Sequence, residues 1–320
     1  MKILITGAAG FIGFHLCKSL LENGNDIFGI DNLNSYYDPQ LKTARLNHLQ
    51  QFSNFEFSKL DIADKEKLES IVSKFQPERI VNLAAQAGVR YSIENPYVYL
   101  DSNITGFLNI LECCRKFEIK GLIYASSSSV YGGNETYPSH PEDKTEKPLA
   151  LYGATKKSNE LMAYAYSNLY GIPTTGLRYF TVYGPWGRPD MALYKFAELI
   201  LSGDPIPVYN QGKMKRDFTY IDDIIKGTVA AIERNFENEI FNLGNNKSEN
   251  LMDMISILET SIDTKANVNL MPLQPGDVLE SYADIEKSEK LLGYVPKTCI
   301  EEGIPKFVAW LKQYKSENGK

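Results

Sequence analysis

Residues 2–13 read KILITGAAGFIG, a short apolar run followed by three glycines at intervals of three. This order predicts a strand, a tight turn and a helix. Gly7 permits the turn, Gly10 lets the backbone approach a phosphate, and Gly13 lets the helix lie close to the sheet. The free N–H groups at the start of the helix suit a pyrophosphate. Because a glycine triplet also serves plain turns, the surrounding sequence is needed to distinguish the two.

An acidic residue strengthens the dinucleotide interpretation. Asp31 ends the next apolar run, 18 residues after Gly13, where a carboxylate hydrogen-bonds the adenosine ribose. Its charge would repel a 2′-phosphate, which favours NAD over NADP. The alternative, a turn or cap formed by Asp31 and Asn32, explains less of this ordered pattern. Asp61 and Ile62 follow the third apolar run and are expected either to contact the adenine or to cap a helix.

Short apolar runs alternate with amphipathic stretches through the first half of the chain. This alternation predicts a parallel sheet with helices on both faces, joined by right-handed crossovers. We therefore expect an α/β protein with a doubly wound (Rossmann) parallel sheet. The predicted strands are 2–6, 26–30, 55–60, 80–83, 122–125 and 174–179, and the predicted helices are 11–22, 41–51, 65–75, 98–117 and 152–170.

The second half has more glycine and proline and shorter helical patterns. It predicts a smaller C-terminal α+β region that binds the substrate. A helix at 221–233 and a strand at 240–243 can still return to the first sheet. We therefore predict two interleaved domains, with residues 1–177 and 219–247 binding NAD and residues 178–218 and 248–320 binding the substrate.

The composition excludes several classes of protein. The 320 residues carry 34 Lys and Arg against 40 Asp and Glu, a net charge of −6, which argues against nucleic acid or an anionic membrane as partner. No apolar run approaches the ~20 residues needed to span a bilayer. The four cysteines match neither a disulfide framework nor a zinc motif, and the three histidines lie far apart. We expect a reduced, cytoplasmic protein without a bound metal.

Tyr152 and Lys156 lie four residues apart at the start of a predicted helix, so both project from one face. A buried cation beside a phenol favours the phenolate and would lower a pKa that is ordinarily about 10. Such a phenol can remove a hydroxyl proton while hydride leaves the same carbon. The spacing alone is common on solvated helices. The hydroxyl-rich run SSSSVY at 126–131 favours catalysis, because it follows the fifth strand at the edge where doubly wound folds bind ligands.

Together these motifs resemble the extended short-chain dehydrogenase/reductase family of nucleotide-sugar epimerases and dehydratases. The resemblance covers essentially the whole chain, including the glycine loop, the Tyr-x-x-x-Lys pair and the run RDFTYIDD at 216–223. Two longer stretches are similar to the UDP-glucuronate 4-epimerases of that family, QAGVRYSIENP at 86–96 and LRYFTVYGPWGRPDMA at 177–192.

The resemblance implies an NAD-dependent enzyme that interconverts UDP-glucuronate and UDP-galacturonate. Hydride passes from C4 to NAD, the 4-keto sugar turns over, and hydride returns to its other face, so NAD should stay bound. Tyr152 would be the base, Lys156 its electrostatic partner and holder of the nicotinamide ribose, and Ser127 the partner of the 4-hydroxyl. The cofactor contacts implied by the family are Gly7, Gly10, Phe11, Ile12, Gly13, Asp31, Asn32, Asp61, Ile62, Leu83, Ala84, Ala85, Tyr152, Lys156 and Tyr179.

Two departures from the family pattern indicate which group of enzymes within the family the chain resembles. Ser128 and Ser129 stand where the dehydratases carry an Asp-Glu pair, and the Glu of the decarboxylating UDP-xylose synthases is absent. Hydroxyl donors suit a sugar carboxylate. We therefore expect Ser128, Ser129 and Thr181 to hold that carboxylate, with Arg188 as a charged neighbour, although Thr181 is also typical of a strand end and Arg188 of a surface loop.

The remaining substrate contacts rest on the resemblance alone. It implies that Arg216 binds the diphosphate and Asp277 the ribose of UDP, and it leaves Arg90 to either the sugar pocket or the fold. A homodimer is implied through helix 98–117 and the helix that carries Tyr152. Two alternatives stay open: a 4-epimerase of UDP-N-acetylhexosamines or UDP-hexoses, and a catalytically silent NAD-binding regulator, against which the intact Ser127, Tyr152 and Lys156 argue.

Overall fold

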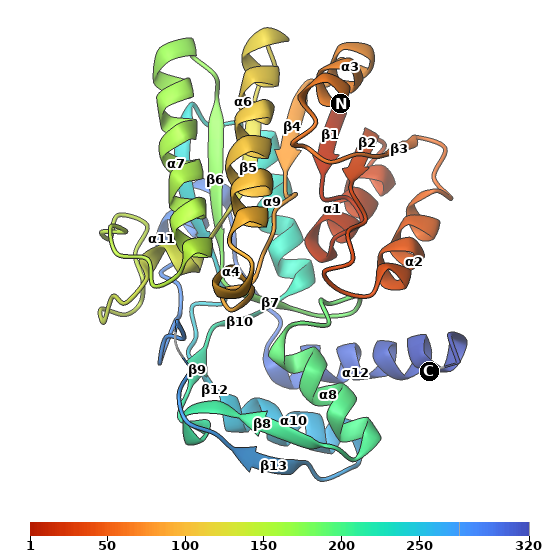
Figure 1. Cartoon of the computed structure of the whole chain (residues 1–320), viewed down its shortest axis with the longest axis vertical. Coiled ribbons are helices and arrows are strands. Elements are labelled where there is room, and N and C mark those ends of the chain that lie inside the picture. The colour runs from red at the N-terminus through yellow and green to blue at the C-terminus, as the bar shows by residue number, and fades with distance from the viewer. Residues whose placement is uncertain (275, 320) are drawn as a thin grey trace.

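A seven-stranded parallel sheet forms the centre of the protein in the computed structural model, which describes residues 1–274 and 276–319 (Figure 1). The strand order is β11-β6-β5-β4-β1-β2-β3. The chain therefore winds outward from β1 in two directions, which confirms the predicted doubly wound α/β fold. The strands are β1 (Lys2–Thr6), β2 (Asp26–Asp31), β3 (Phe55–Lys59), β4 (Arg79–Asn82), β5 (Leu122–Ser127), β6 (Thr174–Tyr179) and β11 (Asn238–Leu243).

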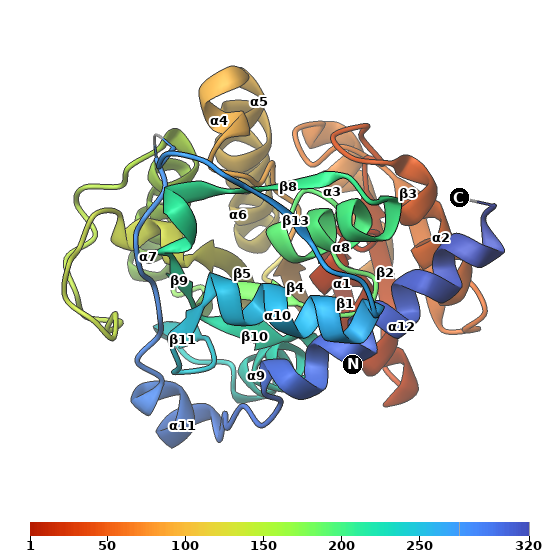
Figure 2. The ribbon, with the colours of Figure 1, turned by 90° about the horizontal axis from the view of Figure 1, so that it is seen from below.

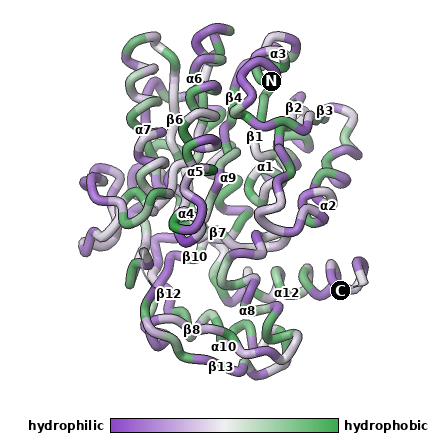
Figure 3. Tube along the Cα trace, in the orientation of Figure 1, coloured by the Kyte–Doolittle hydropathy of each residue, from purple (hydrophilic) through white to green (hydrophobic). Residues whose placement is uncertain are grey.

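Helices cover both faces of this sheet, and a hydrophobic core lies on each side. One core includes Leu16, Ile224 and Phe307 and continues into the C-terminal region, while the other includes Phe107 and Ala163. Hydrophobic and hydrophilic residues alternate along the outer helices (Figure 3), as expected for helices with one buried stripe. The helices are α1 (Phe11–Glu22), α2 (Pro39–Leu49) and α9 (Ile221–Arg234) on one face and α3 (Lys65–Phe75), α6 (Gly106–Lys116) and α7 (Leu151–Tyr170) on the other.

The predicted helix 98–117 contains a π-helical segment. Residues 97–116 are helical without a break, but the π-helical η1 (Leu100–Thr105) joins α5 (Tyr97–Tyr99) to α6. This segment places Asn103 in a buried site, where its side chain bonds Gln86 and Thr155. Gly106 follows, and a Cβ there would lie 2.5 Å from Ile62. The predicted helix is therefore present, and it packs closely against the loop after β3.

The smaller region lies beyond the carboxyl edge of the sheet, at the bottom of Figure 1 and facing the viewer in Figure 2. Two elements of the second half, α9 and β11, return to the main sheet, where β11 pairs with β6. The exact domain ranges stay a prediction. The other elements are α4 (Tyr91–Glu94), η2 (Ser128–Tyr131), β7 (Thr181–Tyr183), α8 (Ala192–Ser202), β8 (Pro205–Val208), η3 (Tyr209–Gly212), β9 (Lys215–Arg216), β10 (Phe218–Tyr220), β12 (Glu249–Asn250), α10 (Leu251–Ile262), β13 (Asn267–Leu270), α11 (Glu286–Leu292) and α12 (Ile300–Glu317).

The sheet order also locates a crevice. β1 lies between β2 and β4, and the crossovers change direction there, so the loops after β1 and β4 diverge to opposite faces. Doubly wound folds bind their ligands outside the carboxyl ends of the strands at such a point. Within the described part of the chain, no helix is both long enough and apolar enough to cross a membrane.

Candidate active site

A cavity of about 680 Å³ lies between the carboxyl edge of the sheet and the smaller region. Every catalytic, cofactor and substrate residue predicted from the sequence lines it, although these residues come from widely separated parts of the chain. The roles assigned to them stay predictions, because lining a cavity does not establish a contact with a ligand.

The glycine loop closes tightly on its neighbours. Gly7 has a φ of +73°, and a Cβ there would lie 2.8 Å from the backbone nitrogen of Ala84, in the loop after β4. A Cβ on Gly13 would lie 2.0 Å from the carbonyl oxygen of Gly7. No side chain caps α1, which begins at Phe11, so its first N–H groups face the cavity unpaired by a capping group. The loop thus forms a cradle in which only glycine fits.

Asp31 lies at the end of β2 with its carboxylate buried. It accepts hydrogen bonds from the backbone N–H of Ala9 at 3.2 Å and of Leu33 at 2.8 Å. Burial raises the pKa of this carboxyl, while the nearby charge of Lys42 and these hydrogen bonds act in the opposite direction. Asn32 donates to Asp61 at 2.8 Å. The two predicted adenosine contacts on β2 and after β3 therefore lie together.

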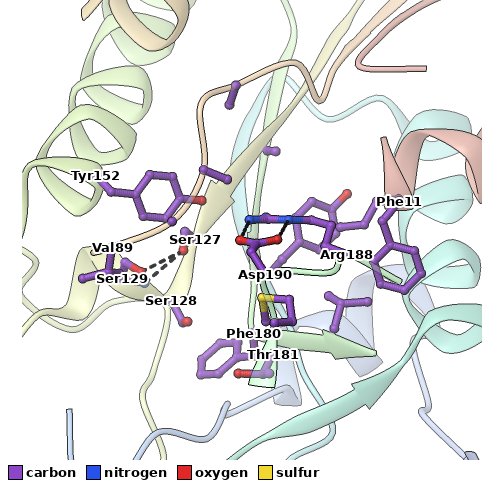
Figure 4. A pocket seen from close by; sticks show the side chains of 18 of the residues that line it. Phe11, Val89, Ser127, Ser128, Ser129, Tyr152, Phe180, Thr181, Arg188 and Asp190 are labelled. Carbon is purple, nitrogen blue, oxygen red and sulfur yellow. Dashed lines mark hydrogen bonds and ion pairs between the residues drawn. The ribbon is translucent and has the colours of Figure 1, made fainter. Parts of the chain in front are cut away.

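Strand β5 and helix α7 hold the predicted catalytic residues against one another (Figure 4). Lys156 donates its Nζ proton to the carbonyl oxygen of Ala125 at 3.0 Å. The Ser127 side chain lies beside the Tyr152 phenol, and its Oγ accepts from the backbone N–H of Ser129 at 3.1 Å. The end of β5 thereby positions both the hydroxyl and the phenol beside the cavity.

The acidity of this pair differs from the sequence-based expectation. Burial raises the pKa of Tyr152, and the neighbouring Ser127 hydroxyl and the charge of Arg188 only partly oppose it. Burial also lowers the pKa of Lys156 to about 8. The prediction that Lys156 lowers the phenol pKa below its ordinary value is therefore wrong for the protein alone, because desolvation is the largest effect on both groups.

Hydroxyl groups and a charged pair line the next part of the cavity. Ser128 and Ser129 come from η2 and Thr181 from β7, and their side chains gather on one side of Ser127 (Figure 4). Arg188 lies on another side of Ser127, where its Nε donates to Asp190 at 3.0 Å. Burial opposes the Arg188 charge, but Asp190 outweighs that effect and raises the guanidinium pKa.

At the far end, the predicted nucleotide contacts interact with one another. Arg90 forms an ion pair with Asp277 at 2.8 Å and stacks over the Tyr209 ring at 4.6 Å. Arg216 donates to the backbone carbonyls of Val278 and Lys215 at 2.7 and 2.8 Å. Arg90 therefore connects the segment after β4 to the segment that carries Asp277, a contact that agrees with the structural alternative for Arg90.

Sequence reasoning assigned no role to Tyr36 and Asp190, which line the cavity, or to Asn103, which is buried against the catalytic helix. Tyr36 donates to Asp190 at 3.2 Å, which joins the loop after β2 to the Arg188 pair. Asn103 donates to Thr155 at 3.0 Å and so contacts the catalytic helix from η1. No sequence spacing predicts these contacts. The only local signal was the motif YFTVYGPWGRPD at 179–190, which ends at Asp190.

The site has the features of a dinucleotide-dependent oxidoreductase. These are a parallel doubly wound sheet, a glycine cradle at its switch point, and a Ser-Tyr-Lys group at the same edge. A family model described as the NAD dependent epimerase/dehydratase family matches residues 3–244. The chain belongs to this family. NAD is its cofactor, and the cradle of Gly7 and Gly13 with the acidic Asp31 fits that dinucleotide.

Similar proteins within this family include 4-epimerases of UDP-sugars. The chain is 45% identical over 97% of its length to a UDP-glucuronate 4-epimerase of Thermodesulfobacterium geofontis, of which it covers 96%. A crystal structure of UDP-glucuronic acid 4-epimerase from Bacillus cereus, in complex with UDP-glucuronic acid and NAD, is 38% identical with a TM-score of 0.93, covering 98% of this chain and all of that one. A UDP-glucose 4-epimerase of Thermotoga maritima, solved with UDP-glucose, is 33% identical with a TM-score of 0.90, covering 98% and 99%.

Proposed function

We propose that this protein interconverts UDP-glucuronate and UDP-galacturonate by inverting C4 of the sugar. The observation that carries the proposal is the group of three hydroxyls, Ser128, Ser129 and Thr181, beside the Ser127–Tyr152–Lys156 site. Dehydration would need carboxyl side chains at that place, whereas small donors suit a uronate carboxylate. The proteins named UDP-glucuronate 4-epimerase, at 38 and 45% identity, support the same substrate.

The protein's own groups supply position and proton transfer. Ser127 binds the 4-hydroxyl oxygen, and Tyr152 takes its proton as the bond from C4 to hydrogen breaks. Lys156, fixed to Ala125, supplies positive charge beneath the phenol. When bound, NAD would supply the acceptor for the hydride from C4 and the donor that returns it to the opposite face. Tyr152 then gives its proton back to the oxygen, so the protein ends the cycle unchanged.

The carboxylate of the sugar creates a further demand. A 4-keto uronate is a β-keto acid, which loses CO₂ when its carboxylate aligns with the keto group. We propose that Ser128, Ser129 and Thr181 hold the carboxylate out of that alignment, with Arg188 as the neighbouring charge. Arg216 and Asp277 are proposed to bind the diphosphate and ribose of UDP, as the sequence implied.

The test is incubation of the purified protein with UDP-glucuronate, without added NAD, followed by separation of the sugar nucleotides. Formation of UDP-galacturonate to a fixed ratio supports both the reaction and a retained cofactor. Tyr152→Phe should stop it, whereas Tyr170→Phe, at the half-exposed end of the same helix, should not. Conversion of UDP-glucose or UDP-N-acetylglucosamine in place of UDP-glucuronate would instead favour the second candidate, to which the likeness to the UDP-glucose 4-epimerase points. No conversion of any of them would favour a silent NAD-binding regulator.

A homodimer and a cytoplasmic location belong to the same proposal. The location rests on the cysteine usage alone. The dimer is supported by large apolar side chains on the outer sides of η1, α6 and α7, among them Leu108, Leu161 and Tyr164, which are 40, 59 and 61% exposed. Light scattering should give twice the 36.1 kDa chain mass. Leu161→Glu should halve it, and Met252→Glu, an exposed position on α10, should leave it unchanged.

A further inference from the structure

A buried arginine outside the cavity lining connects the cofactor loop to the sugar loop. Arg45, on α2, is the largest fully buried side chain among the residues that the structure describes. None of the ion pairs found within those residues includes it, and its Nε has no hydrogen-bond partner. The buried Asp31 carboxylate is near enough for the Arg45 charge to lower its pKa, but burying a charge without a direct ion pair is costly. Its position therefore calls for a reason beyond helix packing.

The guanidinium of Arg45 reaches both loops at once. Its Nη1 donates to the carbonyl oxygen of Ala9, in the glycine loop, at 2.9 Å, and to the Tyr37 hydroxyl at 2.8 Å. Its Nη2 donates to the carbonyl oxygens of Trp186 and Gly187 at 2.6 and 3.1 Å. One planar group thus spans two segments that are more than 170 residues apart in sequence.

Arg45 thus holds two backbone segments whose next residues, Gly10 in one and Arg188 in the other, line the cavity. Ala9 is held from two sides, since its N–H donates to Asp31 and its carbonyl oxygen accepts from Arg45. The orientation of these peptides sets that of the following N–H groups at the start of α1. On the other loop, Trp186 has a φ of +61° and leads through Gly187 to Arg188. A left-handed tryptophan needs fixed surroundings to persist.

A second contact supports the same connection. His15, on α1, lies 2.9 Å from the carbonyl oxygen of Pro185 through its Nε2, which donates there. Burial lowers the pKa of His15 to about 4, so the ring is neutral near pH 7. The loop 184–190 is therefore attached to the cofactor side by a neutral histidine and by a permanently charged arginine.

We infer that Arg45 is a positioning residue that couples binding of NAD in the glycine loop to the arrangement of the sugar-binding loop that carries Arg188. Its guanidinium donates to the carbonyl oxygen of Ala9 in the glycine loop. Its other backbone hydrogen bonds hold Trp186 and Gly187, which precede Arg188. Because coupling between two binding affinities is reciprocal, an occupied nucleotide-sugar site should tighten the binding of NAD through the same group, and a gain in affinity appears mostly as slower dissociation. This inference rests on the proposed function for the role of the loop that carries Arg188 and for the choice of UDP-glucuronate as probe.

The test measures exchange of bound NAD against isotopically labelled NAD in the holoenzyme, with and without saturating UDP-glucuronate at its epimerisation equilibrium. In the unaltered protein UDP-glucuronate should slow exchange at least about fivefold, the lower end of typical coupling. In Arg45→Met, exchange without UDP-glucuronate should be about tenfold faster, and the effect of UDP-glucuronate should fall close to onefold. Arg45→Lys keeps the charge but not the planar fork, and should be intermediate. It also serves as the test variant if Arg45→Met does not fold.

Leu49→Ala is the matched control, because Leu49 lies one turn further along α2 and is fully buried. It should lower the melting temperature and leave the slowing by UDP-glucuronate as in the unaltered protein. The inference is overturned if UDP-glucuronate is converted but does not slow exchange in the unaltered protein, if both Arg45 variants keep the full slowing, or if Leu49→Ala loses it equally. Conversion of UDP-glucuronate by the unaltered protein reports separately on the proposed function.

Discussion

Replacing Glu160 by glutamine should destabilise the protein strongly, because the change leaves a buried guanidinium without its counter-charge. Glu160 lies on α7 one turn beyond Lys156 and is 3% exposed. Arg178, on β6, donates to its two carboxylate oxygens at 2.8 and 2.9 Å, and Ser126, on β5, donates at 2.7 Å. The pair therefore joins the catalytic helix to two central strands.

The magnitude follows from burial and chain length. Removing one partner of a buried ion pair costs about 3–5 kcal/mol. An unfolding entropy of about 2.1 cal/mol/K per residue gives roughly 0.7 kcal/mol/K for the 320 residues of this chain. The melting temperature of Glu160→Gln at pH 7 should therefore fall by about 4–7 °C. Glu302→Gln, which removes one partner of the exposed Glu302–Lys306 pair, should leave it nearly unchanged.

The pH dependence of stability distinguishes loss of the Glu160 charge from a change in how its side chain packs. Burial alone would raise the pKa of Glu160, but Arg178 reverses this and lowers it. A carboxyl whose pKa is lower in the folded state stabilises the protein above its unfolded pKa and loses that contribution as the pH falls. The difference in melting temperature between the unaltered protein and Glu160→Gln should therefore become smaller below about pH 4.5. Differential scanning calorimetry between pH 3.5 and about pH 7 measures both effects. A fall of less than about 1 °C at pH 7, or an equal fall at both ends, would refute the reasoning.

Other perturbations test the site and the smaller region. Tyr152→Phe should lower the rate of epimerisation by about 10²–10⁴-fold while bound NAD, released by denaturation and quantified, stays stoichiometric. Asp31→Asn should weaken NAD and improve NADP binding relative to it, which competitive titration can measure, and an unchanged preference would remove Asp31 from the specificity argument. Thr181→Ala should release some UDP-pentose from UDP-glucuronate, and its absence from the product mixture would count against the carboxylate-holding role. Burial raises the pKa of Asp217 to about 6, so protonation favours the folded state. Melting temperatures should therefore fall as the pH rises through about 6, and Asp217→Asn should lack this component.

The sequence predicted the main sheet well because its signals are local. Each central strand is a short apolar run bounded by turn residues, so the six predicted strands agree with the structure to within two residues at either end. The glycine loop and Tyr152–Lys156 are likewise local patterns with a fixed geometric meaning. The π-helical segment η1 within that helix was not predictable in this way. It carries Asn103, whose hydrogen bonds go to Gln86 and Thr155 in other elements.

The parts of the site that sequence reasoning missed are all contacts between distant segments. Arg45 has the appearance of an ordinary charged residue on an amphipathic helix, yet it is wholly buried and bonds three backbone carbonyls. Arg90 and Asp277 were considered separately, and only the fold brings them within 2.8 Å. Spacing along a chain identifies residues that share an element. It contains no information on which loops meet across a cavity.

The wrong expectation for the phenol pKa has a mechanistic consequence. Burial favours the uncharged forms of both Tyr152 and Lys156, so near pH 7 the phenol of the protein alone keeps its proton. Further positive charge in the cavity is needed to favour the phenolate, and the oxidised nicotinamide carries such a charge. Proton removal is then restricted to the loaded site, where hydride also has an acceptor. A protein built in this way gains from retaining its cofactor, which is the property that the connection through Arg45 would reinforce whenever a nucleotide sugar is bound.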